Sequence, residues 1–191
     1  MKTIAISAES VRVARPLFQV EGSGSTPTSA LSLFFGNTDR ETFKRINLHL
    51  HSRLPKIGAS QGRAFYSAEH DGVIYAVAMW SNPVARLLPQ LEWLELRRLA
   101  ISDDSPKNTA SRFIAWMVRD IRKRFPDVVR LISYQDCEVH QGTIYKASGW
   151  HPAEGYKGRK RGWKAGSGGG GQRSGRTNQA VSVRMRWELE L

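Results

Sequence analysis

A long amphipathic helix between two apolar strands is the feature that most constrains the fold of this chain. The helix is predicted over 106–125, where Ser105 takes the cap position and Pro106 begins the first turn. Apolar residues recur along it every three or four positions. Strands are predicted on either side of it, over 91–101 and 128–134. A strand, a helix and a second strand in this order predict a right-handed crossover with parallel strand pairing, which indicates an α/β fold.

The remaining predicted elements surround that unit. The segments 64–69 and 73–80 read as strands of a hairpin, and Asp71-Gly72 between them supplies a tight turn. A glycine after an acidic residue suits this turn because its backbone adopts positive φ without strain. The other elements are a first helix from residue 40, capped by Thr38 or Asp39 and ended by Pro55, a short helix over 142–148, and a strand over 181–189.

Length and composition favour one folded core with a basic appendage. The chain has 191 residues, of which 40% are hydrophobic, and six are tryptophan. This content excludes a wholly disordered chain. We divide the sequence into a weakly patterned N-terminal segment (1–36), a core (37–156), a flexible basic Gly-rich loop (157–180) and a final strand (181–191).

The sequence carries no signal for a membrane or secretory protein. No apolar run approaches the roughly 20 residues that a transmembrane helix needs. The first residues lack the apolar stretch and small-residue site of a secretory signal. The single cysteine, Cys137, can form no internal disulfide, which fits a reducing compartment. We therefore expect a cytoplasmic protein without a membrane partner.

The positive charge of the chain is unevenly distributed. Lys and Arg number 29 against 17 Asp and Glu, a net charge of +12. Nine of these basic residues and only two acidic ones fall within 157–191. The excess predicts a polyanionic partner, with nucleic acid the first candidate, and a solubilising tail is the alternative. The residues that we assign to DNA binding are Arg159, Lys160, Arg161, Lys164, Arg173 and Arg176.

Polar side chains follow the first of the two predicted parallel strands. Ligands of α/β proteins bind at the carboxyl ends of such strands, beside the next helix N-terminus. Ser105, Lys107 and Asn108 are candidate donors to an anionic group of a cofactor there, and Arg98 could bind a phosphate or carboxylate with two hydrogen bonds. The same residues also fit a well-capped helix and a surface arginine.

The second parallel strand also ends in residues that can do chemistry. Ser133, Tyr134 and Asp136 close it, and His140 follows in the loop. A carboxylate, a phenol and an imidazole can share general acid–base work or hold a metal. Tyr145, on the next short helix, either donates a proton to a leaving group or packs against a neighbouring tryptophan.

The region from Glu95 to Trp150 resembles the phage Mom-type DNA-modification family. The stretches ELRRLAISDDSPKNTASRFIAWMVRDIRKR, LISYQD and GTIYKASGW carry the resemblance. It implies a GNAT-like acyltransferase fold, with a mixed central sheet flanked by helices. It also implies transfer of a carbamoylmethyl group to the exocyclic amine of adenine in phage DNA, which protects that DNA from host restriction enzymes. The implied partner is duplex DNA with the target adenine flipped out, in the host cytoplasm.

The resemblance further implies a metal and a group donor. The metal would be iron(II), held by an acid and by a His-Tyr-Ser segment. Asp136 matches the acid, and His51 stands in His49-Leu50-His51-Ser52 where tyrosine is expected; we add His140 as a further candidate ligand. The donor is either acetyl-CoA or a glycine-derived compound, because the segment 102–109 lacks the glycines of a diphosphate-binding loop.

Two other classes of function stay open. The same fold would serve an N-acetyltransferase that acts on a small molecule or a protein with acetyl-CoA. A non-catalytic nucleic-acid-binding module would explain the charge without any chemistry. The sequence leaves open whether the chain works as a monomer or as a dimer.

Overall fold

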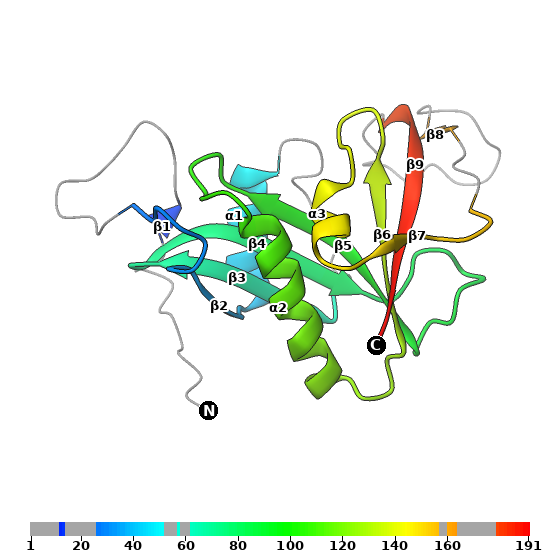
Figure 1. The fold of residues 1–191 in the computed structure, drawn as a ribbon, viewed down its shortest axis with the longest axis horizontal. Helices are drawn as coiled ribbons and strands as arrows, with labels where there is room; N and C mark the ends of the chain where they lie inside the picture. The colour runs from blue at the N-terminus through cyan, green and yellow to red at the C-terminus, as the bar shows by residue number, and fades with distance from the viewer. Residues whose placement is uncertain (1–11, 14–25, 52–56, 58–61, 157–159, 164–178) are drawn as a thin grey trace.

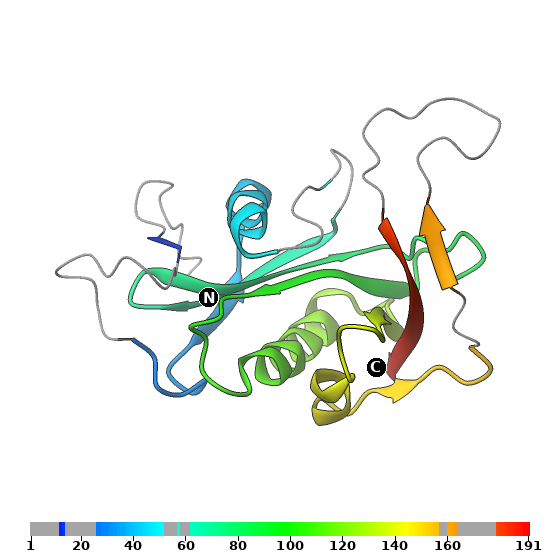
Figure 2. The same ribbon diagram turned by 90° about the horizontal axis from the view of Figure 1, so that it is seen from above.

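A mixed β-sheet with helices on both faces forms the centre of the molecule (Figures 1 and 2). The computed structural model describes residues 12–13, 26–51, 57, 62–156, 160–163 and 179–191. The strands in chain order are β1 (Arg12–Val13), β2 (Phe34–Asn37), β3 (Ala64–His70), β4 (Val73–Ser81), β5 (Trp93–Ile101), β6 (Arg130–Asp136), β7 (His151–Pro152), β8 (Lys160–Trp163) and β9 (Gln179–Glu190). The helices are α1 (Arg40–Leu50), α2 (Thr109–Arg124) and α3 (Thr143–Ala147).

The order of strands across the sheet is β2-β3-β4-β5-β6-β9-β7, with β1 beside β4 and β8 beside β9. Figure 2 shows α1 on one face of this sheet and α2 with α3 on the other. Along the seven-strand path, β5 and β6 pair in parallel and the other neighbours are antiparallel. Because α2 connects β5 to β6, the predicted α/β crossover with parallel pairing is confirmed.

Two apolar clusters hold the helices to the sheet. The larger cluster lies under α2 and α3, where Trp80 of β4 donates its indole N–H to the sulfur of Met117 at 3.2 Å. The smaller cluster lies under α1. Fully buried side chains of the larger cluster include Tyr66, Trp80, Leu94, Phe113, Ile114, Met117, Ile121 and Leu131, and those of the smaller one Phe43, Ile46, Val77 and Met79.

The hairpin of β3 and β4 forms as the sequence predicts. Asp71 and Gly72 have φ of 48° and 76°, so both turn residues lie in the left-handed region that a two-residue hairpin turn requires. The first helix also begins as predicted, because the Asp39 side chain accepts the Thr42 backbone N–H at 2.8 Å. The prediction that Pro55 ends this helix is wrong. The helix ends at Leu50, where His51 becomes extended while its N–H still bonds the carbonyl of Asn47.

The predicted start of the long helix is wrong by three residues. The structure begins α2 at Thr109, with Asn108 in the cap position at a left-handed φ of 66°. The Ser105 hydroxyl donates instead to the carbonyl of Tyr75 at 3.1 Å, and the Pro106 carbonyl accepts from the Thr109 hydroxyl. The loop before α2 is therefore fastened to the start of β4, an interaction that local sequence rules do not predict.

The helix α2 is amphipathic and ends in basic residues. Arg122, Lys123 and Arg124 occupy its last turn, where positive charge complements the helix dipole. None of the helices in the described ranges is both long and apolar enough to cross a membrane.

Removal of the α1 cap should destabilise the protein in a pH-dependent way. Asp39→Ala should lower the free energy of unfolding by about 1 kcal/mol at pH 7, because the Thr42 N–H loses its acceptor. Burial alone would raise the pKa of Asp39, but hydrogen bonds from Thr42 outweigh it, and the pKa lies below its ordinary value of 3.8. A carboxyl with a lowered folded pKa stabilises above its unfolded pKa and loses that contribution as the pH falls through the folded value.

Urea titrations at pH 7 and well below pH 3.8 measure this effect. The deficit of Asp39→Ala should shrink in acid, whereas the exposed control Glu41→Ala should stay within about 0.5 kcal/mol of the native chain. A deficit of the same size at both pH values contradicts the cap as its source.

Candidate functional site: the split between β5 and β6

The strands β5 and β6 pair over only four residues and then separate. Pairing runs from Trp93 with Arg130 to Leu96 with Ser133. Beyond this point β5 continues along β4 and β6 continues along β9. In the described part of the chain, the edge of β5 that faces β6 has no strand partner from residue 97 onward. Figure 1 shows the two strands diverging from their paired ends, with α3 beside the opening.

An extra residue in β5 accompanies the separation. On the β4 side, Met79 pairs with Arg98 and Trp80 pairs with Leu96, so Arg97 has no residue opposite it. Such a bulge bends a strand and increases its twist. The bend falls on the residue after the last β5–β6 pair, and it therefore directs β5 away from β6.

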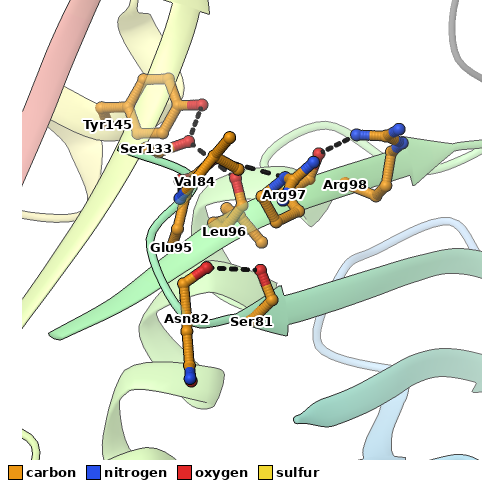
Figure 3. A network of polar contacts seen from close by, with 9 residues as sticks. All are labelled: Ser81, Asn82, Val84, Glu95, Leu96, Arg97, Arg98, Ser133 and Tyr145. Carbon is orange, nitrogen blue, oxygen red and sulfur yellow. Dashed lines mark hydrogen bonds and ion pairs between the residues drawn. The ribbon is translucent and has the colours of Figure 1, made fainter. Parts of the chain in front are cut away.

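A pair of hydroxyl groups closes the point where the strands part (Figure 3). The Ser133 hydroxyl lies 2.8 Å from the Tyr145 hydroxyl and donates to the Leu96 carbonyl at 3.3 Å. Since Ser133 has one proton to give, Tyr145 is the donor of the hydroxyl pair. Burial raises the pKa of Tyr145, and the bond with Ser133 acts in the opposite direction. The Tyr145 ring stacks on Trp187 at 5.4 Å and packs against Trp150 at 5.8 Å, so it has the predicted packing role.

The other face of the split carries charged and phenolic side chains. Side chains alternate along a strand, so Ser133 faces the helices α2 and α3 while Tyr134 and Asp136 face the other way. In β9, Arg186 pairs with Tyr134 and Arg184 pairs with Asp136. Their side chains share that face with Glu95 of β5. The charge of Glu95 raises the pKa of Tyr134, and the charge of Arg184 lowers the pKa of Glu95. We call Glu95, Arg97, Arg98, Tyr134, Asp136, Arg184 and Arg186 the charged face.

Glu95 is the buried carboxylate of the charged face. It is only 5% exposed, accepts the Val84 N–H at 2.8 Å and lies 3.3 Å from the Nε of Arg97. Burial raises the pKa of Glu95, while the Val84 bond and the charges of Arg97, Arg98 and Arg184 oppose the rise. Because burial dominates, the neutral acid is favoured in the folded protein more than in the unfolded chain.

Arg98 presents a donor for which the described residues offer no acceptor. Burial and the neighbouring charge of Arg97 lower the pKa of Arg98 to about 10, against the attraction of Glu95. One Nη donates to the Arg97 carbonyl at 2.8 Å, but its Nε is buried and has no hydrogen-bond partner among the described residues. A buried donor without an acceptor costs about 1–3 kcal/mol. A carbonyl or an anionic group of a ligand would satisfy it, so Arg98 stays a candidate for binding such a group.

Tyr134 is held in place on the charged face by aromatic and ionic contacts. Burial and the charge of Glu95 raise its pKa, and a hydrogen bond with Arg186 lowers it. The ring meets Tyr156 edge-on at 6.0 Å, and the Arg186 guanidinium lies 5.1 Å from the centre of that second ring. The Nε of Arg186 is also 2.7 Å from the carboxylate of Glu188.

The three predicted metal ligands form no complete site among the described residues, although Asp136 and His140 are neighbours: the His140 N–H bonds the Asp136 carbonyl at 3.0 Å. Asp136 ends β6, half-buried, and its carboxylate accepts the Glu138 N–H at 3.1 Å. His51 follows α1, and His140 is exposed in the loop after β6. Within the ranges that the structure describes, no group of three His, Cys, Asp or Glu side chains could hold a metal ion. The donor set Asp136, His51 and His140 thus does not fit iron, and no step is derived through a metal.

The segment predicted to bind a cofactor lies at the carboxyl end of β5. The Ser105 hydroxyl is occupied by the Tyr75 carbonyl, while Lys107 and Asn108 are exposed at the start of α2. These three residues remain candidates by position.

Most of the side chains assigned to DNA binding lie outside the described residues. These are Arg159, Lys164, Arg173 and Arg176; for Lys160 and Arg161 the structure describes the backbone, in β8. The prediction of a loop over all of 157–180 is wrong at both of its described parts, because 160–163 form a strand beside β9 and β9 itself begins at Gln179. The backbone pairing brings this basic segment to the strand that carries Arg184 and Arg186.

Of the charged face, the sequence analysis assigned Arg98, Tyr134 and Asp136 to the site and did not single out Glu95, Arg184 or Arg186. The signal for Glu95 was the second of two acids in the largely apolar run LEWLEL, a position that reads equally well as solvent-facing. The signal for the two arginines was the alternation of apolar and basic residues in VRMRW. This pattern predicted a strand but did not indicate which strand lies beside it in the sheet.

A sequence profile of the Mom protein family matches residues 46–164 of the chain, more than half of its length. The chain belongs to the Mom protein family. The matched region of this Mom-family protein runs from α1 through β8 and contains both sides of the split, with Glu95, Arg98, Ser133, Asp136 and Tyr145. No curated protein matches the chain.

Solved structures of GNAT acetyltransferases share the fold of this Mom-family chain. An IAA acetyltransferase from Bacillus cereus ATCC 14579 superposes with a TM-score of 0.58 at 13% identity, over 84% of this chain and 100% of that one. The ribosomal-protein-S18-alanine N-acetyltransferase from Escherichia coli gives 0.56 at 12%, over 83% and 93%. A Bacillus subtilis acetyltransferase in complex with CoA gives 0.53 at 12%, over 83% and 97%. The predicted GNAT-like fold is confirmed.

Two substitutions of Glu95 should separate the effect of its charge on stability from the effect of its hydrogen bond to Val84. Glu95→Gln keeps an acceptor for Val84 but resembles the neutral acid, which the folded protein favours, so its free energy of unfolding at pH 7 should equal or exceed that of the native chain. Glu95→Ala leaves the Val84 N–H without this acceptor and should lose about 2 kcal/mol. A raised folded pKa means that the native chain gains stability as the pH falls towards 4.5, the ordinary pKa of the group.

Urea unfolding at pH 7 and near pH 4.5 measures both variants. Any excess in the free energy of unfolding of Glu95→Gln over the native chain should be present at pH 7 and disappear near pH 4.5. A Gln variant that is less stable than the native chain at pH 7 contradicts the assignment of a burial-dominated Glu95.

Proposed function

We propose that this Mom-family protein is a DNA-modifying transferase that adds a carbamoylmethyl-type group to the exocyclic amine of adenine. The observation that carries the proposal is the family match over 46–164, which spans both strands of the split, β5 and β6, with Glu95, Arg98, Ser133, Asp136 and Tyr145. In phage DNA, such a modification would block recognition by host restriction enzymes.

The open edge of β5 is suited to a donor that carries amide or carbonyl groups. Among the described strands, residues 97–101 pair with β4 alone, so their outer backbone groups are available to an extended ligand. The buried Nε of Arg98 lies at the same stretch and calls for an acceptor. Acetyl-CoA and a glycine-derived donor both carry such groups. Transfer of a carbamoylmethyl group requires the glycine-derived donor, because acetyl-CoA, the kind of donor that the CoA complex of the Bacillus subtilis relative supports, would deliver only an acetyl group.

The hydroxyl pair supplies the acid of the reaction. Burial favours the neutral phenol of Tyr145, so that the group holds a proton at neutral pH. Tyr145 donates this proton to the leaving group as its bond to the transferred group breaks. Ser133 lies 2.8 Å from the phenol and orients it.

The charged face receives the nucleotide. The exocyclic amine of adenine is a weak nucleophile, because its lone pair is delocalised into the ring, and it is paired and stacked in the duplex. Flipping the base out costs a few kcal/mol. Asp136 accepts the proton that the amine loses, and Arg184 and Arg186 of the neighbouring strand bind the phosphates that flank the flipped base. Tyr134 offers an aromatic edge for the base.

Removal of the proposed base should abolish modification without unfolding the protein. Asp136→Ala changes a half-buried carboxylate at the end of β6, so the sheet should form as before. Nucleoside mass spectrometry of DNA from cells that express the variant should detect no modified adenine. Glu138→Ala, two residues further along and exposed, is the matched control and should modify as the native chain does. Modified adenine at native levels with Asp136→Ala would refute its role.

Neutralisation of the basic segment should weaken DNA binding at every sequence. Replacing Arg159, Lys160, Arg161, Lys164, Arg173 and Arg176 by Gln should flatten the plot of log K against log salt concentration, by about 0.9 for each phosphate that the variant no longer neutralises. Fluorescence anisotropy over a salt series measures the slope. Arg122→Gln with Lys123→Gln, exposed at the end of α2, is the control. The same slope in both variants would contradict a DNA-binding role for the segment.

An N-acetyltransferase acting on a small molecule or a protein is the second candidate. The acetyltransferase relatives, one of them with CoA bound, favour it. Calorimetry separates the two: tight binding of acetyl-CoA without binding of DNA favours this alternative.

A further inference from the structure

The loop over 82–92, which joins β4 to β5, presents apolar side chains to solvent. Leu87 is 99% exposed, Leu91 is 73% exposed and Val84 is 57% exposed. Arg86, next to the most exposed of them, is also on the surface. Single exposed apolar residues are ordinary in soluble proteins, but three within eight residues of one loop indicate a binding surface.

The loop is ordered by its own hydrogen bonds. The Leu88 N–H bonds the Ala85 carbonyl at 3.0 Å. The Gln90 side-chain amide donates to that same carbonyl at 3.1 Å and to the Leu88 carbonyl at 2.9 Å. Pro83 and Pro89 restrict the backbone on either side of the tip. The Leu87 side chain is thus held out in a fixed loop, which reduces the entropic cost of binding.

The same loop is fastened to the proposed nucleotide site. The Val84 N–H donates to the Glu95 carboxylate, and Glu95 pairs with Arg97 on the charged face (Figure 3). Only two residues stand between Val84 and Leu87, so the apolar tip lies within about 10 Å of this anchor. The tip therefore lies near the Glu95 end of the charged face, the face to which the proposed function assigns the nucleotide.

We propose that the loop 82–92 is a wedge that inserts Leu87 into the base stack beside the target adenine. This inference rests on the proposed function, because it concerns how that function gains access to a stacked base. Apolar side chains that enter a base step unstack it and offset the cost through added contacts. Leu87 fills the space that the adenine leaves, and Arg86 contacts the adjoining phosphate.

The charge around the tip favours DNA over a protein as the occupant of this surface. The five arginines of this region (Arg86, Arg97, Arg98, Arg184 and Arg186) outnumber its four acids, which are Glu92 in the loop, Glu95 and Asp136 on the charged face, and Glu188 beside Arg186. An apolar tip within a positive surface fits the stacked interior and anionic exterior of a duplex.

Three variants test the wedge by its dependence on base stacking. Leu87→Ala removes the apolar side chain of the wedge, and Leu87→Met replaces it with an apolar side chain of similar length. Leu31→Ala is the control, because it changes a leucine outside the loop, before β2, that is 74% exposed. Anisotropy gives the affinity for a fluorescein-labelled duplex and for the single strand of the same sequence. Mass spectrometry gives modified adenine in DNA from expressing cells.

We expect Leu87→Ala to bind the duplex about tenfold more weakly, a loss of about 1.4 kcal/mol, and to modify about tenfold less adenine. Its affinity for the single strand, which has no stack to open, should match that of the native chain. Leu87→Met and Leu31→Ala should resemble the native chain in all three measurements.

Three outcomes would overturn the wedge. One is native duplex binding and modification by Leu87→Ala, and another is an equal loss on duplex and single strand. The third is a change in oligomeric state on sedimentation with duplex binding intact, which would make the loop a protein interface. If the native chain neither binds nor modifies DNA, the proposed function fails together with the wedge.

Discussion

The short parallel pairing of β5 with β6 is the constraint on which the rest of the site depends. Two strands that stayed paired along their length would satisfy each other's backbone hydrogen-bonding groups and leave no open edge for a ligand. The bulge at Arg97 bends β5 away from β6. At the residue before the bulge, the Leu96 carbonyl accepts a hydrogen bond from the Ser133 hydroxyl. Because β4 and β9 pair with the outer edges of the diverging strands, the sheet stays continuous around the opening.

Alternation along β6 separates two kinds of chemistry. Ser133 lies on the helix side with the buried phenol of Tyr145, while Tyr134 and Asp136 lie on the side of the arginines. A buried hydroxyl pair and a half-buried carboxylate thus lie on opposite faces of one strand. Under the proposed function, donor and nucleotide approach from opposite sides and meet at the split, so neither has to leave before the other can bind.

The sequence predicts those parts of the structure that depend on neighbours along the chain. The apolar stripe of 106–125 predicts the crossover, and Asp71-Gly72 predicts the hairpin, because both follow from local backbone and packing rules. Contacts between distant segments account for the errors. Ser105 is bonded to Tyr75, thirty residues earlier, and α2 therefore begins later than its capping sequence suggests. The charged face depends on the register of β9 on β6, which no pattern within either strand specifies.

The position of β9 has a consequence for the way the chain folds. It closes the edge of β6, yet more than forty residues separate the two strands in the sequence. Contacts between such distant segments form slowly, since the closure of a long loop must precede them. Until β9 arrives, β6 is an open strand edge, the kind that pairs with other chains and promotes aggregation. The arginines that complete the site join it in the same late step, so a partly folded molecule lacks them.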